Sequence, residues 1–558
     1  MKLSRNLALA ATFASTTLID FVIAFRNVVY IDEYHTTLSK DADYSGITHA
    51  IMAFVDPLNF TKEEKLFPTP PLMAVSDIRK YFRDGTQVGI AIGGWGSGST
   101  NFGYVSTEAN RTTFAKNLAG WVAKYGYDFV DIDWEYPGGN GDRRFPLFLS
   151  EIKNALKNGT KTTGLSLSLA GTEAGMLAFN TTERAKKVWD NADFVTVMAY
   201  DLVNCVSTAT GHHSSVEGSK QSVQRYLNLG LDPQKINLGF AFYAKYFQTA
   251  GPCNDTQLPT GCPIKKAQFD NGTDTYTSGT LTYEPHNMNR TFPVPTGLGT
   301  DVHGTCGWMN NTLTNYICAE DACCGESGWC GYKPEHCIPN CQVGYGRCDG
   351  PDVAQSFNRA QASAHYDEKE GGLWYLDTSE NPPLFWTWDD TTVMMRKFDE
   401  IVNDKNHTLG GISGWSLGED SSTWEHVKAM GEMAKMRQSV VQSTATMPSS
   451  TAVPSSTEAP SSTEVPSSAE VPSSTAASDP SVTATSIPTE VTTSVATPTS
   501  PGTVSPPSSQ PTTFVSSTTA SSSPSFPTGV TTTSTPIPVP ASTLVPSSSA
   551  GQGACGSA

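Results

Sequence analysis

The chain has 558 residues, of which 37 are lysine or arginine and 54 are aspartate or glutamate, so its formal net charge is −17. A chain of this length predicts several modules. The acidic balance argues against nucleic acid and anionic membranes as partners. Twelve cysteines, many of them clustered, indicate an oxidising compartment.

The first 24 residues have the pattern of a secretory signal peptide. Lys2 and Arg5 form a basic start, residues 7–19 are mostly apolar, and Val22-Ile23-Ala24 resembles a small-residue cleavage site. Asp20 makes the signal imperfect, but it also interrupts any membrane span, which requires about 20 apolar residues. No later segment of the sequence is long and apolar enough to span a membrane.

Asn-X-Ser/Thr sequons recur along the chain and suggest surface glycosylation. They are Asn59, Asn110, Asn158, Asn180, Asn254, Asn271, Asn289, Asn310 and Asn406. Together with the signal peptide they predict a protein that is secreted, extracellular or associated with a cell wall.

Eight short apolar runs have the composition of β-strands. They are residues 27–32, 48–55, 87–92, 127–135, 163–170, 193–199, 235–242 and 410–415. Segments that can form helices lie between the first seven runs, such as 111–124, 145–156 and one that begins at Thr182. Strands that alternate with helices predict an α/β fold with a parallel sheet, and eight such strands fit a closed (β/α)8 TIM barrel. A doubly wound open sheet is the alternative, but no Gly-x-Gly-x-x-Gly loop follows the first strand.

Residues 127–137 carry four acids, Asp128, Asp131, Asp133 and Glu135, separated by large apolar side chains and followed by Pro-Gly-Gly. Strand side chains alternate between two faces, so Asp131, Asp133 and Glu135 share one face and Asp128 lies on the other. Carboxylates about 6.5–7 Å apart disfavour joint ionisation, so at least one pKa should rise. A raised carboxyl pKa keeps a general acid protonated near neutral pH.

Non-catalytic interpretations of this stretch have less support. An EF-hand Ca²⁺ loop requires a glycine at its sixth position and a helix on each side. A solvated acidic edge would not place Phe129, Ile132 and Trp134 between the acids. The strand ends hold no His/Cys cluster with metal-ligand spacing, so we expect neither a metal nor a cofactor. The adjacent His212 and His213 point opposite ways on an extended chain, which fits a structural or substrate-edge role.

In a TIM barrel the chemistry lies at the carboxyl ends of the strands. The residues expected there are mostly acids, tyrosines and tryptophans: Gly93, Gly94, Trp95, Asp131, Asp133, Glu135, Met198, Tyr200, Asp201, Tyr243 and Trp415. Aromatic rings stack on sugar faces and carboxyl groups protonate glycosidic oxygens, so these residues favour a glycosidase.

The spacing Asp128-x-x-Asp131-x-Asp133-x-Glu135 resembles the signature of family 18 glycoside hydrolases, the chitinases. Gly93-Gly94-Trp95 is similar to the end of their Ser-x-Gly-Gly motif, and Met198-x-Tyr200-Asp201 resembles their Met-x-Tyr-Asp motif. Residues 235–247 and 410–420 resemble their last two strands, so the resemblance covers about residues 25–430. It departs at Ala91, where the family usually has a serine that supports the aspartates.

The resemblance implies retaining hydrolysis of β-1,4-linked N-acetylglucosamine in which the substrate's 2-acetamido oxygen is the nucleophile. Glu135 would be the general acid and base, Asp133 would orient the acetamido N–H, Asp131 would share a proton with Asp133, and Tyr200 would donate to the acetamido group. Trp415 would form the floor of the −1 subsite. The cleft would be lined by Asp201, Tyr243, Met198, Trp95 and Tyr136, with core packing as the alternative for Trp95 and Met198. Asp128, Gly93 and Gly94 would be structural.

The interval between the last two strands is too long for one loop. The resemblance implies an α+β insertion at residues 244–390 within a catalytic barrel of residues 25–436. The interval holds ten of the twelve cysteines, eight of which run close together: Cys306, Cys318, Cys323, Cys324, Cys330, Cys337, Cys341 and Cys348. Four disulfides would stabilise a segment too short to bury much core, and a zinc knuckle is the alternative.

The segment from Cys323 to Cys337 resembles a hevein-type chitin-binding module, which we place at residues 304–349. Trp329 fills one of its three aromatic sugar-binding positions, whereas Ser327 and His336 stand at the other two and Gly325 replaces the usual serine. We therefore expect weakened or altered binding, with a purely structural cap on the cleft as the alternative. Elsewhere Cys253 and Cys262 are expected to pair, and Cys205 and Cys555 have no obvious partner.

Residues 437–558 are rich in Ser, Thr and Pro and cannot bury a core, which predicts a disordered, O-glycosylated linker or stalk. A lipid-anchor signal ends in a hydrophobic tail. The sequence ends Gly-Gln-Gly-Ala-Cys-Gly-Ser-Ala, so either there is no anchor or the tail is missing from the sequence. This arrangement of signal peptide, barrel, insertion and Ser/Thr/Pro-rich stalk is typical of a fungal secreted or wall-associated enzyme.

Three functions remain open. The first is a chitinase whose partner is chitin or chitooligosaccharides, the second a chitin-binding lectin, and the third an endo-β-N-acetylglucosaminidase that acts on N-glycans. Intact Glu135, Asp133 and Tyr200 argue against the lectin. The insertion and the hevein-like module favour polymeric chitin over N-glycans. We expect a monomer.

Overall fold

The computed structural model describes residues 25–445, apart from short segments at 37, 41, 63–67, 139–143, 160–162, 254–257, 270–272, 289–295, 310–311 and 339. The predicted signal peptide, the sequons at Asn254, Asn271, Asn289 and Asn310, Cys555 and nearly all of the predicted stalk lie outside the described residues. Within the described part of the chain, no helix has both the length and the apolar character that crossing a membrane requires.

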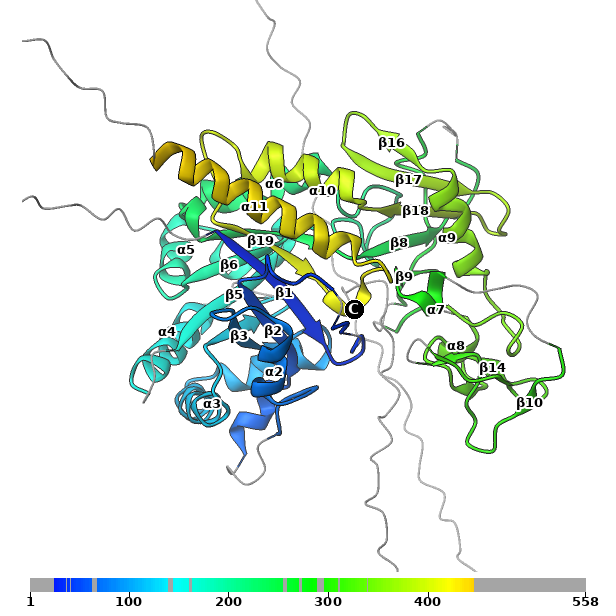
Figure 1. Ribbon diagram of the computed structural model, residues 1–558, viewed down its shortest axis with the longest axis horizontal. Coiled ribbons are helices and arrows are strands. Elements are labelled where there is room, and N and C mark those ends of the chain that lie inside the picture. The colour runs from blue at the N-terminus through cyan, green and yellow to red at the C-terminus, as the bar shows by residue number, and fades with distance from the viewer. Residues whose placement is uncertain are drawn as a thin grey trace, which may run out of the picture. The chain divides into compact units, whose positions relative to one another are not determined.

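Eight parallel strands close into a barrel in the order β1-β19-β7-β6-β5-β4-β3-β2 (Figure 1). This confirms the predicted TIM barrel. The strands are β1 (Arg26–Asp32), β2 (His49–Val55), β3 (Gln87–Gly93), β4 (Phe129–Asp133), β5 (Gly164–Ala170), β6 (Phe194–Met198), β7 (Ile236–Ala241) and β19 (Gly411–Trp415). All eight predicted strands are present. The largest difference is at β4, whose ladders with β3 and β5 both end at Asp133, so that Glu135 lies beyond the strand.

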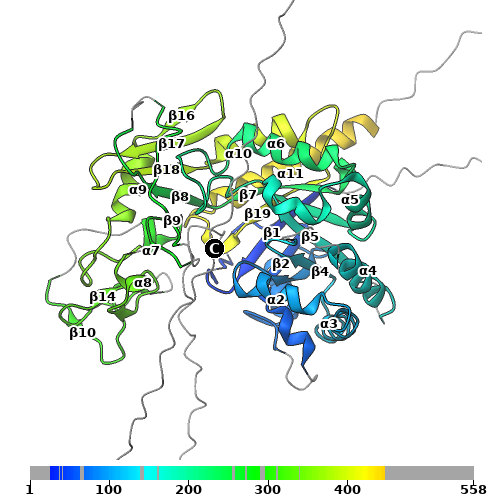
Figure 2. The same cartoon turned by 180° about the vertical axis from the view of Figure 1, so that it is seen from behind.

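Helices cover the outside of the barrel (Figure 2). They are α1 (Val75–Ile78), α2 (Ser97–Val105), α3 (Arg111–Tyr125), α4 (Arg144–Lys157), α5 (Thr182–Trp189), α6 (Val216–Asn228), α10 (Thr391–Lys397) and α11 (Glu425–Ala445). The apolar face predicted for α3 is buried in one core with Val130 and Ile132 of β4. Phe129 belongs to a second cluster with Tyr200 and Trp415, inside the barrel. This alternation turns Asp131 and Asp133 inward.

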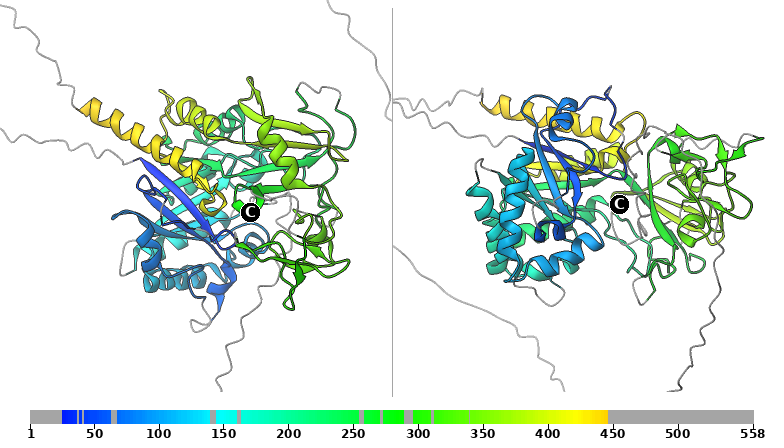
Figure 3. Two further views of the ribbon diagram at one scale, coloured as in Figure 1. Left: turned by 45° about the vertical axis from the view of Figure 1, so that its right-hand side comes forward. Right: turned by 90° about the horizontal axis from the view of Figure 1, so that it is seen from below.

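The insertion begins directly after β7 and forms a five-stranded antiparallel sheet in the order β16-β17-β18-β8-β9 (Figure 1). Figure 3 shows the insertion in green and yellow-green. Its elements are β8 (Tyr243–Gln248), β9 (Ser278–Thr282), α7 (Pro285–Met288), α9 (Val353–Ala362), β16 (His365–Asp367), β17 (Gly372–Asp377) and β18 (Leu384–Trp388). Buried polar contacts join it to the barrel. Ser214 donates to Asp389 over 2.8 Å, and the buried Lys397 of α10 pairs with the same carboxylate.

A disulfide-rich segment lies between β9 and α9. Its short elements are β10 (Gly299–Thr300), β11 (Trp308–Met309), β12 (Thr312–Leu313), β13 (Tyr316–Ile317), β14 (Cys323–Cys324), β15 (Cys330–Gly331) and α8 (Pro334–Cys337). Four disulfides hold it together: Cys306–Cys324, Cys318–Cys330, Cys323–Cys337 and Cys341–Cys348. The Asn340 side chain joins it to β9 by donating to the carbonyl of Thr280 over 3.0 Å. The cysteines of this segment are therefore structural.

Cys205, Cys253 and Cys262 lie outside the disulfide-rich segment. Cys253 pairs with Cys262, the pair expected from the sequence. Cys205, for which the sequence suggests no partner, is also disulfide-bonded. Sequence spacing did not reveal this bond because a disulfide requires only that two Cβ atoms lie close in space.

The turn after β3 can be tested by one substitution. Gly93 has φ +115°, and a Cβ added to it would lie 2.1 Å from the Asp133 carbonyl oxygen. We expect Gly93→Ala to lower the melting temperature by several degrees, because strain and a backbone clash cost more than about 1 kcal/mol. Gly120→Ala is the matched control, since Gly120 lies inside α3 with open space around its Cβ position. Equal melting temperatures for the two variants in a thermal scan would contradict this account.

Candidate active site

Two aspartates of β4 are buried inside the barrel in different surroundings. Burial raises the pKa of Asp131, and hydrogen bonds from Ser166, Ser168 and Tyr30 partly oppose that rise. Burial raises the pKa of Asp133 much further, and the charges of Glu135 and Asp131 add to the effect. Asp133 is 2% exposed, and its Oδ1 has no hydrogen-bond partner in the described part of the chain. Asp133 therefore favours a proton and has a free acceptor.

Glu135 lies just beyond the carboxyl end of β4 and is partly exposed. Its backbone N–H donates to the Ser99 hydroxyl over 2.5 Å, and that hydroxyl donates to the Gly94 carbonyl over 2.7 Å. Burial and the charge of Asp201 raise the pKa of Glu135 to about 7, against the lowering effects of Tyr136 and Lys245. Glu135 can thus hold a proton at neutral pH and also release it.

Gly93 and Gly94 allow the turn after β3 to approach β4 closely. Gly94 has φ +82°, and a Cβ there would lie 2.8 Å from the Phe54 ring. The Gly94 N–H donates to the Asp133 carbonyl over 2.9 Å. The turn therefore fixes the backbone at the point where β4 ends and the chain continues to Glu135.

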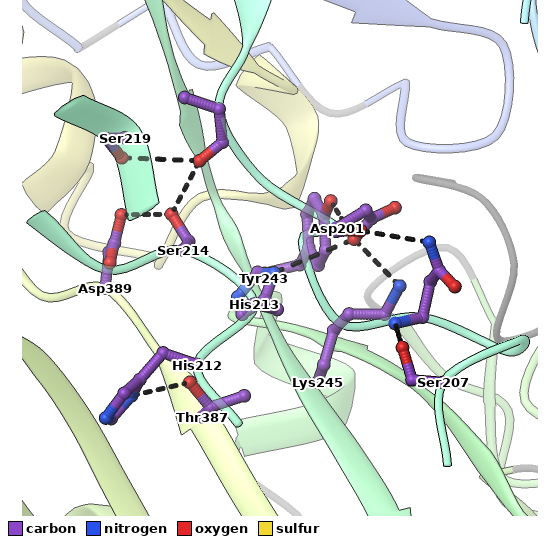
Figure 4. A network of polar contacts seen from close by, with 12 residues as sticks. Asp201, Ser207, His212, His213, Ser214, Ser219, Tyr243, Lys245, Thr387 and Asp389 are labelled. Carbon is purple, nitrogen blue, oxygen red and sulfur yellow. Dashed lines mark hydrogen bonds and ion pairs between the residues drawn. The ribbon is translucent and has the colours of Figure 1, made fainter. Parts of the chain in front are cut away.

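Asp201 follows β6 and is the centre of a buried polar network (Figure 4). Its Oδ1 accepts from the Tyr243 hydroxyl and the Lys245 ammonium, each over 2.8 Å, and lies 3.7 Å from Nδ1 of His213. Burial alone would raise the pKa of Asp201, but Lys245 and His213 lower it below its ordinary value. Asp201 is therefore a fixed negative charge that acts on Glu135.

The adjacent histidines serve two different networks in Figure 4. His213 faces Asp201 and packs on the Tyr243 ring with centroids 5.4 Å apart. His212 lies on the other side, where its Nε2 is 3.2 Å from Asp367. Both rings are buried, and burial lowers the pKa of each.

Aromatic residues form the inner wall of the site. Trp415 is buried at the end of β19, stacks on Phe54 with centroids 5.2 Å apart, and lies 5.4 Å from the Tyr30 ring. Tyr200 is also buried, and burial followed by the charges of Asp133 and Glu135 raises the pKa of its phenol well above the usual range. The Tyr200 hydroxyl thus stays protonated and available as a donor near both acids.

The other residues singled out from the sequence differ in exposure. Trp95 and Tyr136 are 39% and 37% exposed, whereas Met198 is buried inside the barrel. Tyr243, expected to line the cleft, is completely buried, and its hydroxyl binds Asp201. Asp128 accepts from Arg79 over 2.6 Å and from the Val88 N–H over 2.8 Å, away from the other three acids.

Several residues of the site were not identified from the sequence. Tyr30, Ser166 and Ser168 surround Asp131, and Lys245 pairs with Asp201. Lys245 had one available signal, because it lies two residues after Tyr243 and therefore on the same face of an extended strand. The serines had no such signal, because their contact with Asp131 depends on the register between β4 and β5.

A second buried ionic group lies behind Trp415. Asp32 of β1 accepts from Ser416 and lies 3.0 Å from Nδ1 of His35, which is 3.5 Å from Glu419. In the described part of the chain, these three residues place their possible metal-ligand atoms within 4.8 Å of one another. The other groups of this kind contain disulfide-bonded cysteines. Burial lowers the pKa of His35, but Asp32 and the neighbouring acids raise it more. The group therefore contains an internal ion pair that braces the segment after β19.

Comparison with known proteins identifies the family. The family model for glycosyl hydrolases family 18 matches residues 26–420. The chain belongs to this family. The matched residues include all eight barrel strands and the insertion.

Two curated relatives show the extent of the similarity. The chain is 26% identical to "Chitotriosidase-1" of Mus musculus over 233 residues, which cover 38% of this chain and 50% of the relative. It is 32% identical to "Chitinase 1" of Aphanocladium album over 179 residues, which cover 29% of this chain and 42% of the relative. The chain thus spans about half the length of the curated relatives it matches.

Solved structures with a similar chain path include two chitinases. A class V chitinase from Nicotiana tobaccum in complex with NAG4 is 15% identical, with a TM-score of 0.49 and coverage of 74% of this chain and 99% of that one. A chitinase from Rhizomucor miehei is 16% identical, with a TM-score of 0.49 and coverage of 73% and 99%.

The influence of Asp201 on Glu135 predicts a pH shift. Asp201→Asn removes a negative charge that raises the pKa of Glu135 and leaves Lys245, which lowers it. A group that must be protonated then loses its proton at lower pH, so the basic limb of the kcat profile should move below pH 7. Asp367→Asn is the control, because Asp367 pairs with His212 instead. An unchanged or upward-shifted limb for Asp201→Asn would contradict the assignment.

Proposed function

We propose that this protein hydrolyses β-1,4-N-acetylglucosaminide bonds in chitin with retention of configuration, through a mechanism in which the substrate supplies the nucleophile. Residues 25–436 form the catalytic domain, with the insertion at 244–390 and a hevein-like module at 304–349. One observation carries the proposal: Asp133 is a buried carboxyl group with an acceptor oxygen that has no partner among the described residues, beside a glutamic acid whose pKa is about 7.

The free Oδ1 of Asp133 suits an N–H donor from a ligand, because a buried acceptor without a partner costs about 1–3 kcal/mol. An acetamido group supplies that donor, and its carbonyl oxygen can then attack the anomeric carbon of the same sugar. The neighbouring carboxyl group of Asp131 receives three hydroxyl contacts within the protein and has less need of a ligand. Asp133 is therefore the residue that orients the nucleophile.

The first step breaks the glycosidic bond. Glu135 donates its proton to the leaving oxygen while the acetamido oxygen forms a bond to the anomeric carbon, which gives an oxazolinium ion and a free alcohol. Asp133 accepts a hydrogen bond from the acetamido N–H, and the Tyr200 hydroxyl donates a hydrogen bond to the acetamido group. The Trp415 ring lies beneath the sugar.

The second step restores Glu135. Its carboxylate takes a proton from a water molecule, whose oxygen attacks the anomeric carbon from the side that the leaving group vacated. The bond to the acetamido oxygen breaks, and the configuration is retained after two inversions. Mechanisms of this kind are one of the known exceptions to the two-carboxylate scheme of glycosidases.

Glu135→Gln tests the acid. We expect kcat on chitin oligomers to fall by at least about 10²–10⁴-fold, the usual contribution of general acid–base catalysis. Activity of the wild type should decline as the pH rises through about 7. Glu108→Gln on the exposed surface is the matched control and should retain full activity. Retained chitin cleavage by the folded Glu135→Gln protein would exclude the proposed acid.

The same assay separates the alternatives. A lectin would bind oligomers without cleaving them, and the intact Glu135 and Tyr200 argue against it. An endo-β-N-acetylglucosaminidase would release N-glycans from a glycoprotein more efficiently than it cleaves oligomers. The insertion and the disulfide-rich module favour polymeric chitin, so we expect cleavage of the oligomers and little release of N-glycan.

The hevein-like module provides a separate test. Trp329 is 44% exposed, and Tyr332, three residues later, is 68% exposed. His336 instead packs against Gly331, where an added Cβ would lie 2.5 Å from its ring. We expect Trp329→Ala to lower the fraction of protein that sediments with insoluble chitin and to leave kcat/KM on short soluble oligomers unchanged. Phe269→Ala, an exposed aromatic outside the module, should change neither. Unchanged sedimentation of Trp329→Ala would favour a structural cap.

A further inference from the structure

Asp131 is surrounded by hydroxyl groups that take no direct part in either of the two proposed steps. Ser166 donates to its Oδ1 over 2.6 Å, and Ser168 donates to its Oδ2 over 2.9 Å. The Tyr30 hydroxyl lies 3.1 Å from the same Oδ2 and 2.7 Å from the Ser168 hydroxyl. All four residues are buried, so these donors take the place of solvent around the carboxyl group.

The support comes from one side of β4. Asp131 is in register with Ser166 on β5 and with Ala91 on β3. Ala91 is buried and has only a methyl group, so it cannot donate a hydrogen bond. Ser168 lies two residues after Ser166 and therefore on the same face of β5. Asp131 therefore receives its hydroxyl contacts from Ser166 and Ser168 of β5 and from Tyr30 of β1. Ala91 of β3 provides none.

We propose that Ser166 and Ser168 are positioning residues that keep the negative charge on Asp131 and leave the shared proton on Asp133, where the acetamido group of the substrate meets it. The inference rests on the proposed function. Donors to a carboxylate favour its ionised form, and Asp131 has three close hydroxyl groups whereas the free oxygen of Asp133 has no partner among the described residues. The one proton that the pair shares therefore belongs to Asp133.

Removal of the serine hydroxyls has a specific consequence. The pKa of Asp131 rises because burial is then opposed by fewer donors, and the shared proton moves from Asp133 to Asp131. The negative charge thereby moves from Asp131 to Asp133, which is two residues closer to Glu135 along the chain. A closer negative charge favours the protonated form of Glu135, so its pKa rises. A serine that only packs against its neighbours would not change the pH at which Glu135 titrates.

The experiment compares Ser166→Ala, Ser168→Ala and the double variant on a soluble chitin oligomer across a range of pH. We expect the double variant to lose about 10- to 100-fold in kcat, the range of a hydrogen bond to a charged group, with little change in KM. The basic limb of its kcat profile should move to higher pH. Thr196→Val is the matched control, because Thr196 is the in-register neighbour of Ser168 on β6 and its buried hydroxyl has no described partner.

A rescue variant separates positioning from packing. Ala91→Ser introduces a hydroxyl beside Asp131 from the β3 side, so in the Ser166→Ala background it should recover part of kcat and move the basic limb back. A melting scan of each variant identifies any that do not fold, and the single variants then provide the comparison. The proposal is overturned if the double variant behaves like Thr196→Val. It is also overturned if kcat falls while the basic limb of the kcat profile stays at the same pH and Ala91→Ser restores no activity.

Wild-type activity distinguishes this proposal from the proposed function. A wild type that fails to cleave chitin oligomers contradicts the proposed function. An active wild type whose folded serine variants keep both kcat and the basic limb contradicts the positioning role alone.

Discussion

The burial of two carboxyl groups on one short strand, with a third partly buried just after it, is the constraint on which the rest of the site depends. A buried carboxylate without a partner is costly, so each group requires its own compensation. Asp131 has hydroxyl donors from β1 and β5. Asp133 has an elevated pKa and an oxygen without a partner in the described part of the chain, and Glu135 is partly exposed with a pKa of about 7. Three acids of similar chemistry thereby acquire three different protonation behaviours, which is how one strand can support both an acid and an orienting group.

The insertion takes part in this arrangement directly. Tyr243 and Lys245 lie on β8, the first strand of the insertion sheet, and both bind Asp201 after β6. The charge of Asp201 acts in turn on Glu135. The insertion sheet therefore influences the pKa of Glu135 through Lys245 and Asp201, as well as adding a domain beside the barrel. A change in the packing of β8 should reach Glu135 through Lys245.

The sequence predicted the barrel well because each strand combines a local apolar run with turn residues, and these signals require no knowledge of distant contacts. It also predicted that Asp131 and Asp133 face inward, since that follows from the strand period of two. It did not predict that Tyr243 is buried or that the serines of β5 surround Asp131. Those contacts depend on the register between strands that are far apart in sequence. The disulfide of Cys205 was missed for a similar reason, because pairing depends on proximity in the fold.

The central claim is that the acetamido oxygen of the substrate, oriented by Asp133, is the nucleophile. The most direct test measures kcat/KM for a series of chitobiosides that share one leaving group and carry N-acetyl groups with zero, one, two or three fluorine atoms. Fluorine withdraws electrons from the carbonyl oxygen, so the account predicts a steep, steady fall in kcat/KM along the series. A rate that is independent of fluorine content would show that the carbonyl oxygen does not attack, and would contradict the account.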